Sequence, residues 1–178
     1  MILRSPFPDV DIPDVALTPF VMRRAAEMGD RPALICAATG RSYSYRALAD
    51  AIPRCAAGLH ALGIRKGHVV GIVSPNIPEF AIVFLAVASL GAVCSTVNPI
   101  ATAEEIGTQF EDSEARLVVT IPQLLEKCSA ATRVATNVRE IIVIGDADSG
   151  VPFASLFTHG DEAPPVDIDP AKDIVVLP

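Results

Sequence analysis

The sequence alternates short apolar runs with segments of helical length from His68 to Ile144, and this alternation limits the fold more than any other feature. Four runs have the length and composition of buried strands: 69–73, 92–97, 117–120 and 140–144. Three segments of helical length lie between them: 78–90, 103–112 and 122–131. Crossovers of this length join parallel strands, and uniformly apolar strands suit a sheet that helices cover on both faces. We therefore predict an α/β fold built on a parallel sheet with right-handed βαβ crossovers.

An N-terminal helix and a β-hairpin are predicted to precede the alternating region. The helix is expected over 17–28, where Thr18 is placed to cap free backbone N–H groups and Pro19 fits the first turn. Short strands at 33–36 and 42–44 flank a loop that contains a glycine, which is the usual pattern of a hairpin. These elements add an antiparallel pair to the predicted fold.

A second helix is predicted over 44–62, with Ser44 as its N-cap. Apolar residues recur along it at intervals of three and four: Leu48, Ile52, Cys55, Leu59 and Leu62. Pro53 falls inside this pattern, where it removes one hydrogen bond and clashes with the preceding turn. We expect a kink or a break in the helix at that residue.

The composition changes to glycine, proline and aspartate from Asp146 to Asp173. We interpret this stretch as a surface connection, with a short helix at 153–157. A terminal strand at 174–177 follows, and no turn, helix or polar tail comes after it. The pattern predicts an incomplete part of a larger N-terminal domain, with the catalytic residues of the protein after Pro178.

Length and composition narrow the class of protein. The chain has 178 residues, half of them hydrophobic, which is enough for one domain or for a piece of a larger one. Its net charge is −7 and its basic residues are scattered, so a nucleic acid is not an expected partner. The cysteines are widely spaced and lack any CxxC pair: Cys36, Cys55, Cys94 and Cys128. We therefore expect buried, reduced thiols, no metal site and a cytoplasmic location.

Neither the N-terminus nor the longest uncharged stretch is typical of a membrane or export signal. Residues 1–16 contain prolines and aspartates but no apolar core, so we interpret them as an extended arm rather than a secretory signal. Residues 80–103 carry no charge, but Gly91 and the pair Asn98–Pro99 divide them into a helix and a strand. Neither half is long enough to span a bilayer.

The turn after the first parallel strand bears on nucleotide binding. It reads Ser74-Pro75-Asn76-Ile77-Pro78 and lacks the glycines that let a backbone approach a pyrophosphate. No GK[ST] motif occurs either, so dinucleotide and P-loop chemistry are disfavoured within these residues. Two roles are open for Ser74 or Asn76: contact with a ligand at the end of the strand, or capping of the following helix. We favour capping, because it explains both residue types without a ligand.

The remaining polar candidates have plain structural interpretations. Acidic residues lie near both ends of the helix at 103–112: Glu104, Glu105, Glu111, Asp112 and Glu114. No nucleophile or metal partner is near them in the sequence, so we interpret them as a solvated helix face. Three histidines, His60, His68 and His159, show no triad spacing and are taken as structural or surface residues.

Three stretches carry a resemblance to a known family. They are Arg41–Leu48 (RSYSYRAL), Val70–Phe80 (VGIVSPNIPEF) and residues 84–120, with Gly91-Ala92-Val93, Asn98-Pro99, Glu105-Ile106 and Gln109. In this order they resemble the N-terminal segment of adenylate-forming acyl-CoA ligases, with 4-coumarate-CoA ligase the nearest type. In that family the strand matching 173–178 leads into a phosphate-binding loop of the type Tyr-Ser-Ser-Gly-Thr-Thr-Gly, which does not occur here.

The resemblance implies a ligase that activates a carboxylic acid with ATP and passes it to coenzyme A, with Mg²⁺ as a cofactor. It implies that 17–178 is the N-terminal subdomain of that enzyme. No family motif for catalysis, cofactor binding or metal binding maps onto a residue of this chain, so no site residue is named. The chain alone is expected to be an inactive scaffold that binds none of these cofactors.

Two hypotheses remain at this point. In the first, the chain is part of a carboxylate-CoA ligase whose substrate is a hydroxycinnamate-like or a fatty acid. In the second, it is a free-standing, non-catalytic binding or assembly module that pairs with another chain, including a second copy, through an exposed apolar face. The first hypothesis is favoured by the abrupt strand at 174–177.

Overall fold

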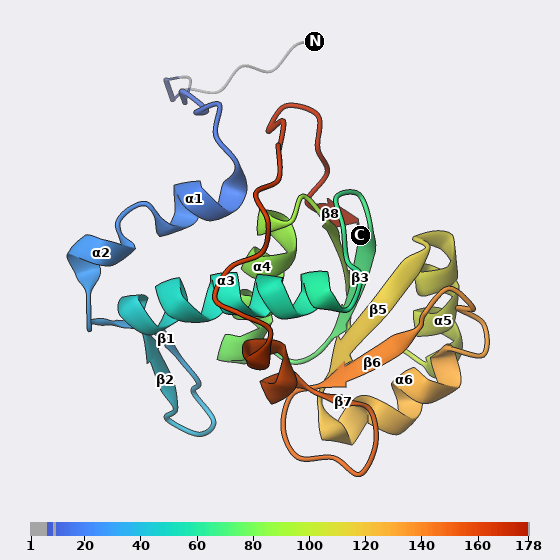
Figure 1. Ribbon diagram of the computed structural model, residues 1–178. Helices are drawn as coiled ribbons and strands as arrows, with labels where there is room; N and C mark the ends of the chain where they lie inside the picture. The colour runs from blue at the N-terminus through green and yellow to red at the C-terminus, as the bar shows by residue number, and fades with distance from the viewer. Residues whose placement is uncertain (1–6, 9, 178) are drawn as a thin grey trace.

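A six-stranded parallel sheet forms the centre of the structure (Figure 1). The computed structural model describes residues 7–8 and 10–177. The strands run in the order β7-β6-β5-β3-β4-β8, and each neighbouring pair is parallel. Their bounds are β3 Val69–Val73, β4 Val93–Val97, β5 Ala115–Thr120, β6 Glu140–Val143, β7 Val151–Pro152 and β8 Val176–Leu177. The predicted parallel α/β sheet is confirmed.

Helices cover both faces of the sheet, as predicted (Figure 1). One face packs against α3 (Tyr45–Ala61) and α4 (Pro78–Ser89), and the other against α5 (Ala103–Asp112) and α6 (Leu125–Ala131). Successive residues of a strand point to opposite faces. Val70 and Ile72 therefore join one buried cluster while Val69 and Val73 join the other. All five residues of β3 are buried, which is why its sequence is apolar throughout.

The N-terminal helix differs from the prediction. The expected single helix over 17–28 is two short helices, α1 (Leu17–Met22) and α2 (Ala25–Met28), because the backbone leaves the helical path at Arg24. Thr18 does not cap the helix. Ala16 occupies the N-cap position, so Thr18 lies inside the first turn, where its buried hydroxyl donates to the Leu85 carbonyl at 2.7 Å. That hydrogen bond fastens α1 to α4.

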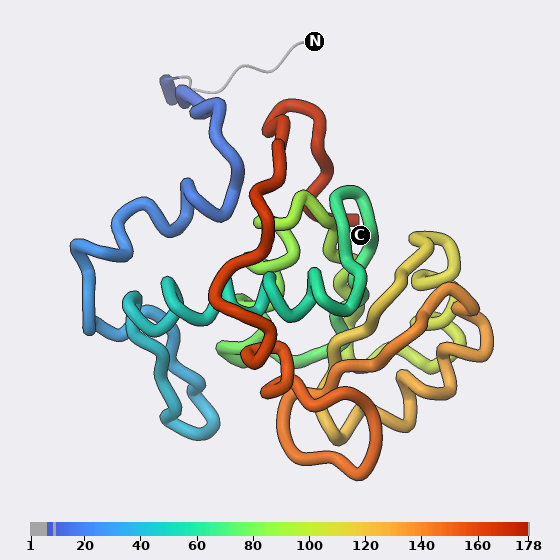
Figure 2. Tube along the Cα trace, viewed as in Figure 1, coloured from blue at the N-terminus to red at the C-terminus, as the bar shows by residue number. Residues whose placement is uncertain are grey.

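The predicted hairpin is confirmed by β1 (Pro32–Ile35) and β2 (Ser42–Ser44), which pair antiparallel. The Ser44 cap of α3 is also confirmed, since its hydroxyl accepts a hydrogen bond from the Ala47 N–H at 3.1 Å. Of the two alternatives predicted at Pro53, the break is wrong, because α3 is one helix from Tyr45 to Ala61 with Pro53 inside it. The kink stays a prediction; Figure 2 shows the Cα trace of the chain in the same view as Figure 1. A proline deletes only one ladder hydrogen bond, and the buried residues on both sides of it keep the helix on the sheet.

The segment predicted as a surface connection between 146 and 173 enters the core. It contains the unpredicted strand β7 and a 3₁₀ helix, η2 (Phe153–Thr158), which confirms the expected short helix at 153–157. Phe153 and Leu156 of η2 are buried against the cluster of α3 and α4. Aspartate, glycine and proline are frequent in this stretch, so its overall composition indicates a surface segment. Composition does not show that two of its apolar residues are buried in the core.

The uncharged stretch 80–103 divides as predicted into α4 and β4, with Asn98–Pro99 after the strand. Helix α4 contains only 12 residues. Among the residues that the structure describes, no helix is both long enough and apolar enough to cross a membrane.

Replacing Gly58 tests the contact between α3 and η2. A Cβ atom at this position would lie 2.3 Å from the Leu156 carbonyl oxygen. We expect Gly58→Ala to lower the free energy of unfolding by about 1–3 kcal/mol, because two backbones must move apart. Helix propensity alone favours alanine by about 1 kcal/mol. Urea unfolding of both proteins measures the difference, and an equal or higher stability of the variant would contradict the close approach.

Candidate functional site

The carboxyl edge of the sheet is the first place to look for a site. In open parallel sheets, ligands bind where the connections of two neighbouring strands leave toward opposite faces. Here β3 and β5 are neighbours, and their connections lead to α4 on one face and to α6 on the other. The turn Ser74-Pro75-Asn76 and residue Thr120 lie at this point.

Hydrogen bonds to the backbone occupy the hydroxyl groups at this edge. Thr120 donates to the Val73 carbonyl at 2.9 Å, and Ser74 donates to the Pro75 carbonyl at 2.9 Å. The predicted cap of α4 is wrong, because Ile77 is the N-cap residue and no side chain caps the helix. Pro78 at the first helical position needs no cap for its own nitrogen, and Ser74 is turned into the protein. Asn76 lies exposed beside it.

A buried carboxylate lies in the first turn of α4, close to this edge. Glu79 is only 2% exposed, and its carboxylate accepts from Arg41 Nη2 at 2.8 Å and from the Tyr43 hydroxyl at 3.0 Å. Burial, together with the charge of Glu79 and this hydrogen bond, raises the pKa of Tyr43. Both partners come from the hairpin, so Glu79 fixes the hairpin to α4. Sequence reasoning did not select it, although an acidic residue inside an apolar helix was the available signal.

The acidic residues of α5 have structural roles, in agreement with the prediction. The Glu105 N–H donates to the Thr102 hydroxyl at 3.2 Å, and Glu105 accepts from the Thr102 N–H at 2.7 Å, which forms a capping box. The hydrogen bonds that the Glu105 carboxylate accepts from the backbone N–H and the hydroxyl of Thr102 lower its pKa. Glu111 accepts from the Thr136 N–H at 3.0 Å. The solvated helix face is confirmed.

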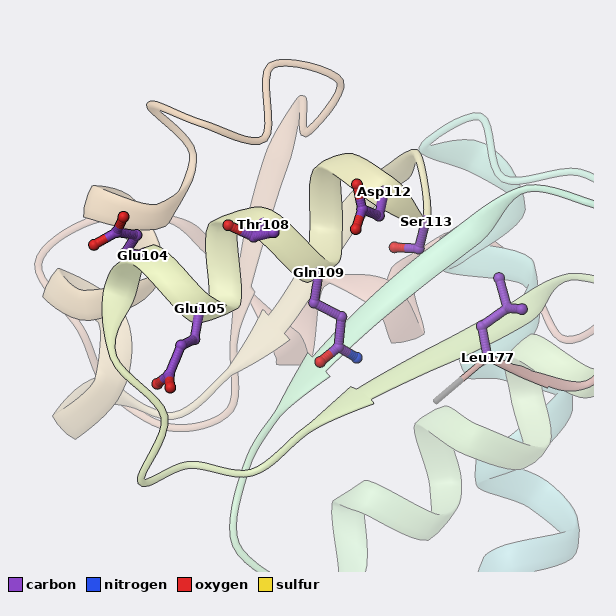
Figure 3. Close-up of a pocket in the computed structure, with 7 residues that line it drawn as sticks. All are labelled: Glu104, Glu105, Thr108, Gln109, Asp112, Ser113 and Leu177. Atoms are coloured by element: carbon purple, nitrogen blue, oxygen red, sulfur yellow. The ribbon is translucent and has the colours of Figure 1, made fainter.

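An open groove of about 580 Å³ runs between α5 and β8 (Figure 3). Seven residues line it: Glu104, Glu105, Thr108, Gln109, Asp112, Ser113 and Leu177. Gln109 reaches from α5 toward the sheet and donates to the Ser95 hydroxyl at 3.0 Å and the Thr96 carbonyl at 3.2 Å. Its amide therefore joins α5 to β4. The groove is lined by carboxylates and hydroxyls, and its lining includes no Lys, Arg, His or Cys side chain.

The three histidines do not come together. His60 lies on α3, His68 directly before β3 and His159 after η2. The pKa of His68 is lowered, first by burial and then by the positive charge of Arg116. Within residues 7–8 and 10–177, no group of three or more His, Cys, Asp or Glu side chains is arranged to hold a metal ion.

All four cysteines are free and buried, as predicted. Burial raises the pKa of both Cys55 and Cys94 to about 12. Cys36 differs from them because hydrogen bonds from the side chain and backbone of Thr39 lower its pKa. It is also 7% exposed, whereas Cys55 and Cys94 are fully covered.

Alkylation with iodoacetamide at pH 8 should therefore modify Cys36 first in the native protein. Only the thiolate reacts, and Cys55 and Cys94 carry almost none at that pH. Mass spectrometry of peptides after short exposures measures the order, and unfolded protein, in which all four react, is the control. Equal rates at Cys36 and Cys55 in the native protein would refute this difference.

Replacing Glu79 tests the link between the hairpin and α4. We expect Glu79→Gln to lower the free energy of unfolding by about 1–3 kcal/mol, because Arg41 and the Tyr43 hydroxyl lose a charged acceptor in a buried place. The matched control is Glu104→Gln on the exposed face of α5, where a change within about 0.5 kcal/mol is expected. Urea unfolding compares the two, and similar losses would show that burial of Glu79 is not the cause.

Comparison with known proteins places most of the chain in one family. The family model described as AMP-binding enzyme matches residues 21–178. 4-coumarate–CoA ligase 5 of Oryza sativa subsp. japonica is 40% identical over 99% of this chain and 32% of its own length. 4-coumarate–CoA ligase 4 of Arabidopsis thaliana is 40% identical over 86% of this chain and 28% of its own length. The chain thus spans about a third of the length of the curated relatives it matches.

Solved structures agree at the level of the fold. A long-chain-fatty-acid-CoA ligase from Archaeoglobus fulgidus superposes with a TM-score of 0.85 at 22% identity, over 97% of this chain and 36% of that protein. The anthranilate CoA ligase AuaEII superposes with a TM-score of 0.83 at 18% identity, over 93% of this chain and 32% of that protein. The family model covers most of the sequence, and this chain belongs to the AMP-binding enzyme family.

Proposed function

We propose that this chain is part of an acid–thiol ligase that converts a carboxylic acid to an acyl-CoA. In the first step the carboxylate attacks ATP to give an acyl-adenylate and pyrophosphate. In the second step the thiol of coenzyme A attacks the acyl carbon and AMP leaves. The observation that carries the proposal is the 40% identity to a 4-coumarate–CoA ligase over 99% of the chain.

The two steps have a simple chemical reason. A carboxylate resists attack by a thiol because it is negatively charged and has a poor leaving group, and adenylation supplies AMP as a good one. Mg²⁺, when bound, stabilises charge on the phosphoryl groups during the first step. ATP, coenzyme A and Mg²⁺ are the cofactors that we propose for the whole protein.

We propose that the described residues take no part in holding these groups during the reaction. The turn after β3 has no glycine-rich loop, its hydroxyls bond to the backbone, and no carboxylate cluster suited to a metal occurs among residues 7–8 and 10–177. For this reaction we therefore propose no catalytic, cofactor-binding or metal-binding role for a residue of this chain. Its proposed role in the reaction is structural, with 17–178 as an N-terminal subdomain that precedes the phosphate-binding loop. The predicted arm over 1–16 lies partly outside the described residues, which omit 1–6 and 9.

We propose a hydroxycinnamate-like acid or a fatty acid as the substrate and the cytoplasm as the location. The curated relatives named as 4-coumarate–CoA ligases support the first acid, and the fatty-acid ligase from Archaeoglobus fulgidus has the same fold. The second candidate function is a non-catalytic assembly module. It is favoured only by the exposed apolar side chains of the chain, among them Val10, Ile12 and Ile100.

ATP–pyrophosphate exchange tests the proposal. The product of the complete reading frame should exchange label in the presence of p-coumarate or of a fatty acid, whereas the 178-residue chain should not. Exchange by the longer protein with one acid would also name the substrate class. Exchange by the 178-residue chain would contradict its proposed structural role. If neither protein exchanges label with p-coumarate or with the fatty acid, the assembly module is favoured.

A further inference from the structure

A row of basic side chains lies at the amino edge of the sheet of this acidic protein. His68 precedes β3, Arg116 is the second residue of β5, and Arg139 precedes β6. These three strands are neighbours in the order β6-β5-β3. Arg65, in the turn before β3, donates from its backbone N–H to His68 Nδ1 at 3.2 Å. Its guanidinium donates to the carbonyls of His60 at 2.6 Å and Ile64 at 2.8 Å, so this charge is bonded to the end of α3 and is not part of the row.

An irregularity of β5 places Arg116 in this row. Val69 is opposite Ala115, but Val70 is opposite Leu117, so Arg116 is an extra residue in β5. Such a bulge turns the side chain of the inserted residue in a direction that a regular strand would not allow. Glu114, just before it, has a φ of 55°, and it is the one non-glycine residue with positive φ in the described part of the chain. The Arg139 N–H donates to the Arg116 carbonyl at 2.9 Å, which places these two arginines side by side.

The row has no bound carboxylate among the described residues. Six other basic residues have an acidic side chain within 4.0 Å: Arg24, Arg41, Arg46, Arg54, Lys66 and Lys172. Arg116 and Arg139 form no such pair, although Glu114 and Glu140 lie near them in the sequence. Other described basic residues, such as Arg31 and Arg133, also lack one, but Arg116 and Arg139 lie on neighbouring strands beside His68.

The pKa of His68 is sensitive to these charges. Its side chain is partly buried, and burial is the main reason that its pKa is lowered. Arg116, Arg65 and Arg139 each lower the pKa further, while the backbone of Gly63 raises it. The imidazole is therefore uncharged at neutral pH, and an anion placed between it and the arginines would raise its pKa again.

We propose that His68, Arg116 and Arg139 form a binding surface for a ligand that carries a diphosphate group. Guanidinium groups bind phosphoryl oxygens through paired, charge-assisted hydrogen bonds. The row extends over two strand spacings, or about 10 Å, which suits two linked phosphoryl groups better than a single small anion. Arg139 is exposed, and His68 and Arg116 are partly exposed, so a ligand can reach them from solvent. The inference does not depend on the reaction proposed above.

Titration of His68 in the 178-residue chain with inorganic pyrophosphate tests the proposal. Proton NMR follows the imidazole signal, and His68→Asn identifies it among the three histidines. We expect a saturable change on adding pyrophosphate and a pKa of His68 that is higher in its presence. Sodium chloride at the same ionic strength is the control for screening, and it should produce no saturable change.

Two variants and a matched control locate the site. Arg116→Gln and Arg139→Gln should each raise the Kd for pyrophosphate about tenfold or more, since each removes a charged contact. Arg133→Gln changes an exposed arginine outside the row and should leave the Kd within about twofold. Urea unfolding checks that each variant is folded. An unsaturable response, an equal loss in Arg133→Gln, or tighter binding of a short polyglutamate than of pyrophosphate would each overturn the proposal.

Discussion

The structure depends on the burial of both faces of a parallel sheet. β3 lies inside the sheet, between β5 and β4, and every one of its residues is buried. Its successive side chains point to opposite faces, where they pack against different pairs of helices. Without its covering helices, either face of the sheet would expose a continuous apolar surface to water. The helices on both sides are therefore required by the sheet, and α3 stays on it in spite of Pro53 because its apolar side is part of this packing.

Long, strongly patterned elements could be predicted from the sequence, and contacts between distant segments could not. The apolar runs from β3 to β6 and the helices between them were recognisable because periodicity is a local property. β7 was missed since Val151–Pro152 is too short to show a period. The roles of Thr18 and Glu79 were missed because their partners, Leu85 and Arg41, are remote in the sequence.

The candidate site shows the same division. The sequence alone shows that the turn after β3 is not glycine-rich. The structure adds that the hydroxyls of Ser74 and Thr120 donate hydrogen bonds to backbone carbonyls. The gathering of basic groups at the opposite edge could not be foreseen. It depends on strand order and on the inserted residue Arg116, and neither property leaves a signal in the local sequence.

The hydrogen bond from Gln109 to β4 also satisfies a backbone acceptor at the edge where β4 meets β8. Cys94 is bonded toward β8 through its N–H, and alternate residues of a strand face the same side, so the Thr96 carbonyl points to that edge as well. Among the described residues, β8 pairs with Cys94 and Ser95, and the Thr96 carbonyl lies just beyond this pairing. Gln109 satisfies this acceptor with a side-chain donor, so the backbone of β4 is hydrogen-bonded there without a partner strand.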